Sequence, residues 1–147
     1  MKSFWILLLV SIFPSLGFAG DECHPNLIGV DMCAQARELQ MHMADNLPQK
    51  MNSEMTLTKI LATGPQLNLY AQFSYNRSYI ENLAAGKISM GDLAEKLKGH
   101  TQTVICKQEV TAAFVRLGGK ISYSYSFSDD NPYMEVLVDH CGPQSNP

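Results

Sequence analysis

A strict alternation of apolar and polar residues runs through positions 118–141 of this chain, GGKISYSYSFSDDNPYMEVLVDHC. Because successive side chains of a strand point to opposite faces, this pattern predicts a β-hairpin around the turn SDDNP, with one buried face and one wet serine face. A peptide-binding edge is the alternative role for its aromatic residues, but a core face is the commoner one. The residues predicted to be buried are Ile121, Tyr123, Tyr125, Phe127, Met134, Val136 and Val138.

A second alternating segment predicts another antiparallel hairpin over residues 54–75. Its second strand, QLNLYAQFSY, carries an apolar or aromatic residue at every second position, so one face should be buried. The Gly64-Pro65 dipeptide supplies the turn. In the first strand the apolar spacing shifts once between Met55 and Leu61, which predicts a β-bulge or a strand end that is buried on both faces.

Helical spacing predicts helices before and between the two hairpins. Apolar residues recur at intervals of three and four over residues 29–46. Ser89 and Asp92 form a capping-box sequence that opens a short helix. A longer and well-buried helix is predicted over residues 101–117, and the glycine pair that follows it supplies a left-handed stop.

The predicted order of elements is helix, strand, strand, helix, helix, strand, strand. Two hairpins separated by helices commonly combine into one antiparallel sheet with the helices packed on a single face. The sequence therefore predicts a single α+β domain over residues 20–141, followed by a disordered tail at residues 142–147.

Four cysteines, an even number, predict two disulfides in an exported protein. Four cysteines allow three pairings, and their order favours Cys23 with Cys33 and Cys106 with Cys141. On the chain-entropy model the first bond stabilises the fold by about 2.7 kcal/mol and the second, which closes the longer loop, by about 3.8 kcal/mol. The predicted role of Cys141 is thus to lock the last strand to the helix that carries Cys106.

Residues 1–19 have the organisation of a secretory signal peptide, with Lys2 first, an apolar run from Phe4 to Phe13, and small residues up to Ala19. The apolar run is too short to cross a hydrocarbon core of about 30 Å as a helix, and no later run is longer. We expect cleavage after Ala19 and export to the periplasm or the medium. The remaining 128 residues are the size of one ordinary domain.

The charges of the mature chain argue against two classes of partner. The mature chain has 10 basic and 14 acidic side chains, a net charge of −4 with neutral histidines, and it has no run of Lys or Arg. Nucleic acids and anionic membrane surfaces are both bound mainly through basic patches. We therefore expect a protein partner, with no membrane span in the mature protein.

No catalytic motif of the common hydrolase, redox or nucleotide-binding classes occurs in the sequence. His24 adjoins Cys23 and His140 adjoins Cys141, but neighbouring residues on a strand point to opposite faces and cannot form a Cys-His dyad. We therefore expect no enzymatic activity, no catalytic residue and no cofactor.

Methionine and histidine residues offer a second functional interpretation. The segment MHMADNLPQKMNSEM contains five possible thioether or imidazole ligands, a set that suits Cu(I) in an exported protein. However, Met41 and Met43 stand about 200° apart on a helix, so most of the set is better explained as core filling. Copper handling is the alternative function, with Met41, His42, Met43, Met51 and Met55, or His24, as candidate ligands.

Two segments, LPQKMNSEMTLTKILATGPQLNLYAQFSY and VICKQEVTAAFVRLGGKISYSYSFSDDNPYMEVLVDHC, carry a family resemblance over residues 47–141. They resemble the small exported bacterial proteins that are grouped as proposed quorum-sensing-regulated virulence factors. In the second segment a helix cysteine, a helix that ends at glycine, a Tyr-x-Tyr strand and a terminal cysteine follow in that order. The resemblance implies an accessory or virulence-related protein without a defined reaction. We expect a disulfide-stabilised binding protein that acts on an envelope, secretion or toxin partner.

Overall fold

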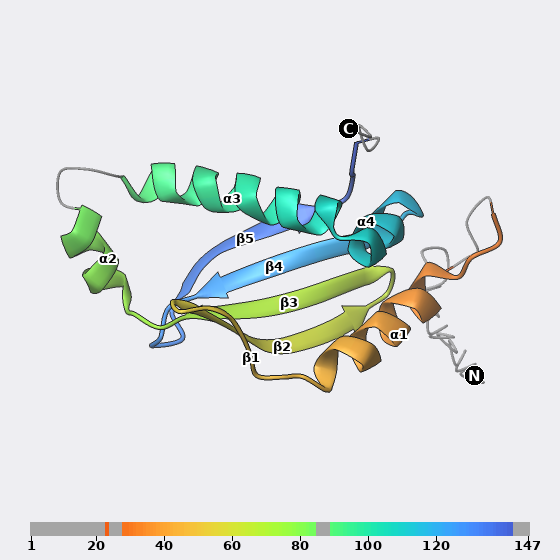
Figure 1. Cartoon of the computed structure of the whole chain (residues 1–147), viewed down its shortest axis with the longest axis horizontal. Helices are drawn as coiled ribbons and strands as arrows, with labels where there is room; N and C mark the ends of the chain where they lie inside the picture. Colours follow the sequence, from red (N-terminus) through yellow and green to blue (C-terminus); the bar gives the residue numbers. More distant parts are fainter. Residues whose placement is uncertain (1–22, 24–27, 85–88, 143–147) are drawn as a thin grey trace, which may run out of the picture.

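The computed structural model describes residue 23, residues 28–84 and residues 89–142 (Figure 1). The predicted signal peptide at residues 1–19, and the predicted tail apart from its first residue, lie outside the described residues. The helices are α1 (Met32–Ala44), α2 (Arg77–Ala84), α3 (Met90–Lys107) and α4 (Glu109–Arg116). The strands are β1 (Gln49–Asn52), β2 (Met55–Thr63), β3 (Gln66–Phe73), β4 (Lys120–Ser126) and β5 (Pro132–Val138).

The five strands form one sheet in the order β1-β2-β3-β4-β5. The two predicted hairpins are present as the antiparallel pairs β2–β3 and β4–β5. The bulge predicted in the first strand appears as a register shift between Leu57 and Lys59 of β2. The short strand β1 adds an antiparallel edge that the sequence pattern did not predict.

The α+β class is confirmed, but the sheet is mixed and not antiparallel throughout. Strands β3 and β4 pair in parallel, with Gln66 opposite Lys120 and Gln72 opposite Ser126. The backbone N–H of Lys120 donates to the carbonyl oxygen of Pro65 over 3.0 Å, which places the two strand starts side by side. The reason is the connection: α2, α3 and α4 return the chain to the end of the sheet where β3 began, so β4 runs in the same direction.

One face of the sheet is buried and forms the core. The predicted alternation holds along β3, where every second residue is buried, and along β4, where Tyr123 and Tyr125 are 8% and 4% exposed. The predicted core role of these aromatic residues is therefore confirmed. The buried strand residues on this face are Leu57, Ile60, Leu67, Leu69, Ala71, Phe73, Ile121, Tyr123, Tyr125, Val136 and Val138.

Helices α1, α3 and α4 cover this buried face at its two margins, whereas α2 lies beyond the end of the sheet (Figure 1). Helix α1 packs on β2 and β3, where the Gln40 side chain accepts a hydrogen bond from the backbone N–H of Ala62 over 2.6 Å. Helix α3 packs along β5, and α4 packs on β4. No helix in the described part of the chain is long and apolar enough to cross a membrane.

None of the helices described in the structure lies on the opposite face of the sheet (Figure 1), which is mostly polar. Lys59 lies 4.1 Å from the centroid of the Tyr70 ring on this face, and Leu137 is 51% exposed. The predicted wet serine face is only partly wet, because Ser122 is fully buried and its hydroxyl donates to the Glu135 carboxylate.

Two local predictions are corrected by the structure. The short helix predicted to open at Ser89 and the helix predicted over residues 101–117 are divided at a different place: α3 runs on to Lys107, and the break lies at Gln108, which has extended backbone angles. The helices α3 and α4 are therefore separate, and Val104 and Val110 are exposed. The alternation of the last strand places Tyr133 on the face opposite Met134 and Val136, but a register shift next to Ser126 turns Tyr133 away from that face. The Tyr133 ring instead lies 5.2 Å from that of Phe127 in the core.

The glycine pair after α4 has the role that the sequence predicts. Gly118 has a φ of 104°, a conformation that favours glycine and ends the helix. At Gly119 an added Cβ would lie 2.5 Å from the buried Phe114 ring, so only glycine allows the chain to pass this close to the core.

Candidate functional site

A groove on the helix-covered face of the sheet separates α3 from β1. It encloses a volume of about 200 Å³. Most of its lining is apolar or aromatic, which is the usual character of a site that binds a ligand by excluding water. The lining residues are Met51 and Asn52 of β1, Met55 of β2, Leu97, His100, Thr101 and Val104 of α3, and Tyr123 and Tyr125 of β4.

Helix α3 forms one wall of the groove. Leu97, Thr101 and Val104 recur at spacings of four and three, so they share one face of the helix. The helix begins at a capping box, in which the hydroxyl of Ser89 accepts from the backbone N–H of Asp92 over 3.0 Å. The hydrogen bonds from Ser89 hold the pKa of the Asp92 carboxyl below its usual range. The capping box predicted from Ser89 and Asp92 is confirmed, and it fixes where this wall starts.

The base of the groove is tied to α3 by a buried hydrogen bond. The hydroxyls of Thr101 and Tyr125 are 2.7 Å apart, and the Thr101 hydroxyl also donates to the carbonyl oxygen of Leu97 over 2.7 Å. Because the Thr101 hydroxyl has one proton and donates it to the Leu97 carbonyl oxygen, the Tyr125 hydroxyl is the donor in the bond between Tyr125 and Thr101. The Tyr123 and Tyr125 rings stack at 5.5 Å. These contacts hold both rings in place before any ligand binds.

Tyr123 presents a phenol hydroxyl that no described residue binds. In the described part of the chain, every buried side-chain oxygen has a hydrogen-bond partner. An oxygen without a partner, such as that of the Tyr123 hydroxyl, is therefore exposed to solvent. Burial of the ring raises the pKa of Tyr123 to about 12, so the hydroxyl stays protonated at neutral pH. The groove therefore combines apolar walls with one fixed hydrogen-bonding group.

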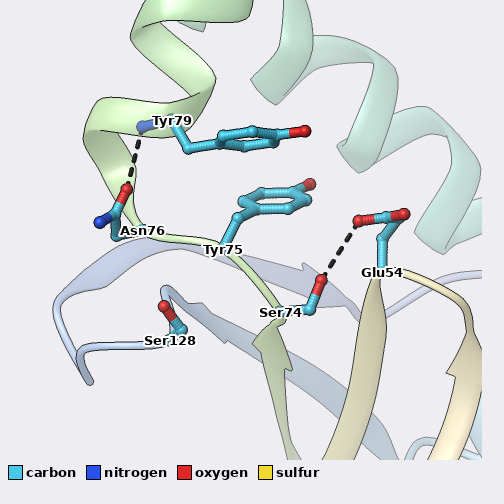
Figure 2. Close-up of a pocket in the computed structure, with 6 residues that line it drawn as sticks. All are labelled: Glu54, Ser74, Tyr75, Asn76, Tyr79 and Ser128. Atoms are coloured by element: carbon cyan, nitrogen blue, oxygen red, sulfur yellow. Dashed lines mark hydrogen bonds between the residues drawn. The ribbon is translucent and has the colours of Figure 1, made fainter.

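A second hollow, the tyrosine pocket, lies where β2, β3 and α2 meet (Figure 2). Its volume is about 430 Å³. The ring centroids of Tyr75 and Tyr79 are 5.5 Å apart with the ring planes tilted by 30°, and their hydroxyls point to the side on which the Glu54 carboxylate lies. Glu54 accepts from the Ser74 hydroxyl over 3.2 Å. The lining residues are Glu54, Ser74, Tyr75, Asn76, Tyr79 and Ser128.

A continuous row of aromatic rings joins the tyrosine pocket to the groove. From the Tyr75 ring the row continues to Phe73 at 5.2 Å and then to Tyr125 at 6.0 Å. Tyr79 and Tyr123 form the two ends of the row. The two hollows also adjoin in sequence, since Glu54 lines one and Met55 lines the other.

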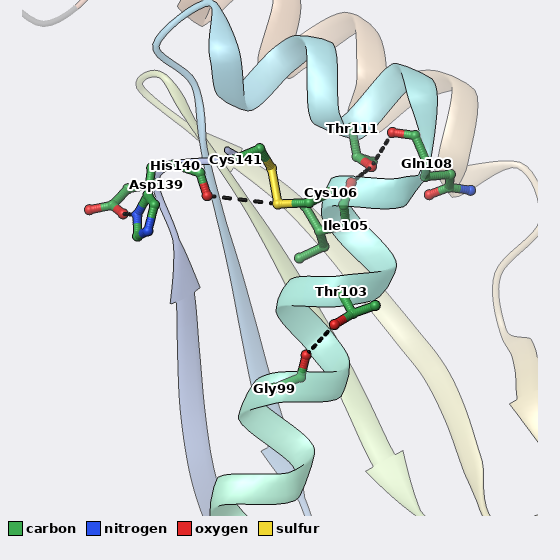
Figure 3. The surroundings of a disulfide bond; sticks show 9 residues. All are labelled: Gly99, Thr103, Ile105, Cys106, Gln108, Thr111, Asp139, His140 and Cys141. Carbon is green, nitrogen blue, oxygen red and sulfur yellow. Dashed lines mark hydrogen bonds and ion pairs between the residues drawn. A yellow bond between two sulfur atoms is a disulfide. The ribbon is translucent and has the colours of Figure 1, made fainter. Parts of the chain in front are cut away.

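Two disulfides join parts of the fold, and one of them holds the end of α3, a wall of the groove. Cys106 at the end of α3 pairs with Cys141 after β5, as Figure 3 shows, and Cys23 pairs with Cys33 in α1. These are the pairings that sequence order favours. The Cys106 sulfur lies 3.7 Å from the carbonyl oxygen of His140, a contact without a shared proton because a disulfide sulfur carries none. With all four cysteines paired, neither Cys141 nor Cys23 offers a free thiol to its neighbouring histidine.

The structure brings only two of the described candidate copper ligands, Met51 and Met55, to the same groove, and places Met41, His42 and Met43 on α1. Met41 is 64% exposed on α1, and Met43 packs against the core from the same helix. His42 lies 3.9 Å from the Glu38 carboxylate. Met51 and Met55 line the groove, and His24 lies outside the described residues. Within the described ranges no three His, Cys, Asp or Glu side chains converge on a possible metal position.

Sequence reasoning missed both hollows. The strand β1 is only four residues long, and QKMN has no alternation that marks it as a groove wall. No sequence signal marked Val104 as part of a groove wall, because its place in an apolar helical pattern predicts burial, whereas it is exposed in the structure.

No protein-family model and no curated protein matches the sequence of this chain. Solved bacterial structures share its fold. A type II secretion system pilotin from Vibrio vulnificus is 12% identical with a TM-score of 0.61, and the match covers 77% of this chain and 94% of the pilotin. A type II secretion system pilotin from Vibrio cholerae is 14% identical with a TM-score of 0.55, covering 74% and 88% respectively.

A proposed secreted protein from Pseudomonas aeruginosa is 12% identical with a TM-score of 0.59, and the match covers 74% of this chain and 88% of that protein. At such identities the likeness shows the fold alone. The bacterial structures agree with the resemblance to small exported bacterial proteins, whereas the quorum-sensing-regulated grouping stays a prediction.

Proposed function

We propose that this chain is an exported, non-catalytic accessory protein that binds a short apolar segment of a partner protein in the groove between α3 and β1. The observation that carries the proposal is the groove itself, with its apolar walls of Leu97, Val104 and Met55 beside the Tyr123 hydroxyl. Such a site gains binding energy from the burial of apolar side chains, and its phenol can donate to a backbone carbonyl of the bound segment.

The class of partner follows from the fold and from the expected compartment. The pilotins with this fold are components of type II secretion systems. We therefore favour an envelope or secretion component as the partner over a toxin. The predicted signal peptide at residues 1–19 and the two disulfides support export to the periplasm or beyond. A virulence-related role is one form of this accessory function.

Two matched valine substitutions test the groove. A random peptide library is selected on the immobilised mature protein, and the affinity of the best synthetic peptide is measured by fluorescence anisotropy. Val104→Glu introduces a carboxylate into the groove, and a bound peptide would bury this charge without a partner. We therefore expect the affinity for the peptide to fall at least tenfold, which corresponds to about 1.4 kcal/mol of binding free energy. Circular dichroism checks that the variant is folded.

Val110→Glu is the control for this comparison. Val110 is 61% exposed and lies on α4, outside the groove lining, so the same change there should alter the affinity less than twofold. A peptide that binds Val104→Glu as tightly as the unmodified protein would contradict the proposal, as would a selection that enriches no peptide.

A further inference from the structure

The tyrosine pocket contains a carboxylate that no described residue neutralises. Among the described residues, the Glu54 carboxylate accepts hydrogen bonds from the hydroxyls of Ser53 and Ser74, at 3.4 and 3.2 Å. No Lys or Arg in the described part of the chain pairs with it. The nearest candidate on α2, Arg77, instead pairs with Glu81 at 3.0 Å. A carboxylate beside two aromatic rings, with no internal counter-ion, is complementary to a positively charged group.

The two tyrosines add the geometry that a planar cation needs. Tyr79 is 50% exposed, so part of the tilted Tyr75–Tyr79 pair is accessible from solvent. The hydroxyls of Tyr75 and Tyr79 have no partner among the described residues, and both point toward the side of Glu54 (Figure 2). A guanidinium group can stack on a phenol ring and donate at the same time to a carboxylate and to hydroxyl oxygens. An ammonium group is a point charge and cannot use both sets of contacts equally well.

We propose that the tyrosine pocket binds an arginine side chain, and that this arginine belongs to the same partner segment that occupies the groove. The second part rests on the proposed function, and the aromatic row from Tyr79 through Tyr75 and Phe73 to Tyr125 supports it by joining the two hollows. The pocket then gives the partner specificity, because it selects apolar segments that have a basic residue at one end.

The first test uses a small probe and does not depend on the groove. N-acetyl-arginine amide is titrated into the mature protein, and the ring resonances of Tyr75 and Tyr79 are followed by NMR. We expect saturable shifts with a dissociation constant on the order of 1–10 mM. N-acetyl-citrulline amide has the same shape without the charge and should bind at least about fivefold more weakly.

Two matched variants locate the binding of the probe. Glu54→Gln should weaken it at least about fivefold, whereas Glu109→Gln removes the same charge from α4, outside the pocket, and should leave it unchanged. Val104→Glu should also leave it unchanged. Three outcomes would overturn the assignment of the pocket: equal binding of the two probes, equal effects of Glu54→Gln and Glu109→Gln, or no saturable shift. None of these outcomes depends on whether a peptide binds in the groove.

The second test joins the pocket to the groove through the selected peptide. We expect the selected peptide to carry an arginine at one end of its apolar segment, and a peptide without one would overturn the shared-partner inference. Replacing that arginine by citrulline should weaken binding at least about fivefold to the unmodified protein but less than twofold to Glu54→Gln. A peptide that depends on Val104 but shows no coupling to Glu54 would overturn the shared-partner inference and leave the proposed function intact. A peptide that is insensitive to Val104→Glu would contradict the proposed function instead.

Discussion

Removing the disulfide between Cys106 and Cys141, with alanine at both positions, is expected to lower the free energy of unfolding by about 3.8 kcal/mol. The two cysteines are 35 residues apart, and the bond removes loop-closure entropy from the unfolded chain. The loop contains α4, β4 and β5, so the bond fastens the last hairpin to the end of α3 (Figure 3). Urea denaturation, followed by circular dichroism, measures the difference.

The second disulfide provides the control for this prediction. Cys23 and Cys33 are only 10 residues apart, and alanine at both positions should cost about 2.7 kcal/mol on the same chain-entropy model. A loss below about 1 kcal/mol for the Cys106–Cys141 pair, or a larger loss for the Cys23–Cys33 pair, would contradict the assigned role of Cys141.

Leu67→Ala is expected to lower the free energy of unfolding by about 2–5 kcal/mol, because it leaves a cavity in the core. Leu67 has no solvent exposure and lies on β3, whose two neighbouring strands prevent the space from closing easily. Leu137→Ala is the matched control, since the same atoms are removed from a side chain that is 51% exposed on the open face of the sheet. Its expected effect is below about 0.5 kcal/mol.

The comparison of the two leucines tests whether only one face of the sheet is buried. Both variants are unfolded in urea under identical conditions, and their transition midpoints are compared at a common slope. Equal losses of stability would mean that the open face is covered in solution, against the arrangement of helices described above.

The faces of the strands could be predicted from the sequence, because they depend on a local period of two. Leu67, Tyr123 and Val136 are buried where the alternation places them. The exception is Tyr133, where a register shift near the turn reverses the side on which the ring lies. Such a shift depends on how the turn closes and leaves no mark in the alternation itself.

The direction of β4 relative to β3 could not be predicted in the same way. It depends on the path of the connection through α2, α3 and α4, which is a property of the packed chain and not of any local pattern. Both hollows arise from the same tertiary packing. Glu54 and Tyr79, or Met51 and Val104, are far apart in sequence and belong to different elements, so no spacing rule could have joined them.

The central claim is that a partner segment lies between α3 and β1, and an NMR map of the selected peptide on the mature protein tests it most directly. We predict that backbone and ring shifts concentrate at Met51, Val104, Tyr123 and the aromatic row that leads to Tyr79. Shifts that concentrate instead around Tyr70 and Leu137, on the open face of the sheet, would contradict the claim and move the binding site to the other side of the molecule.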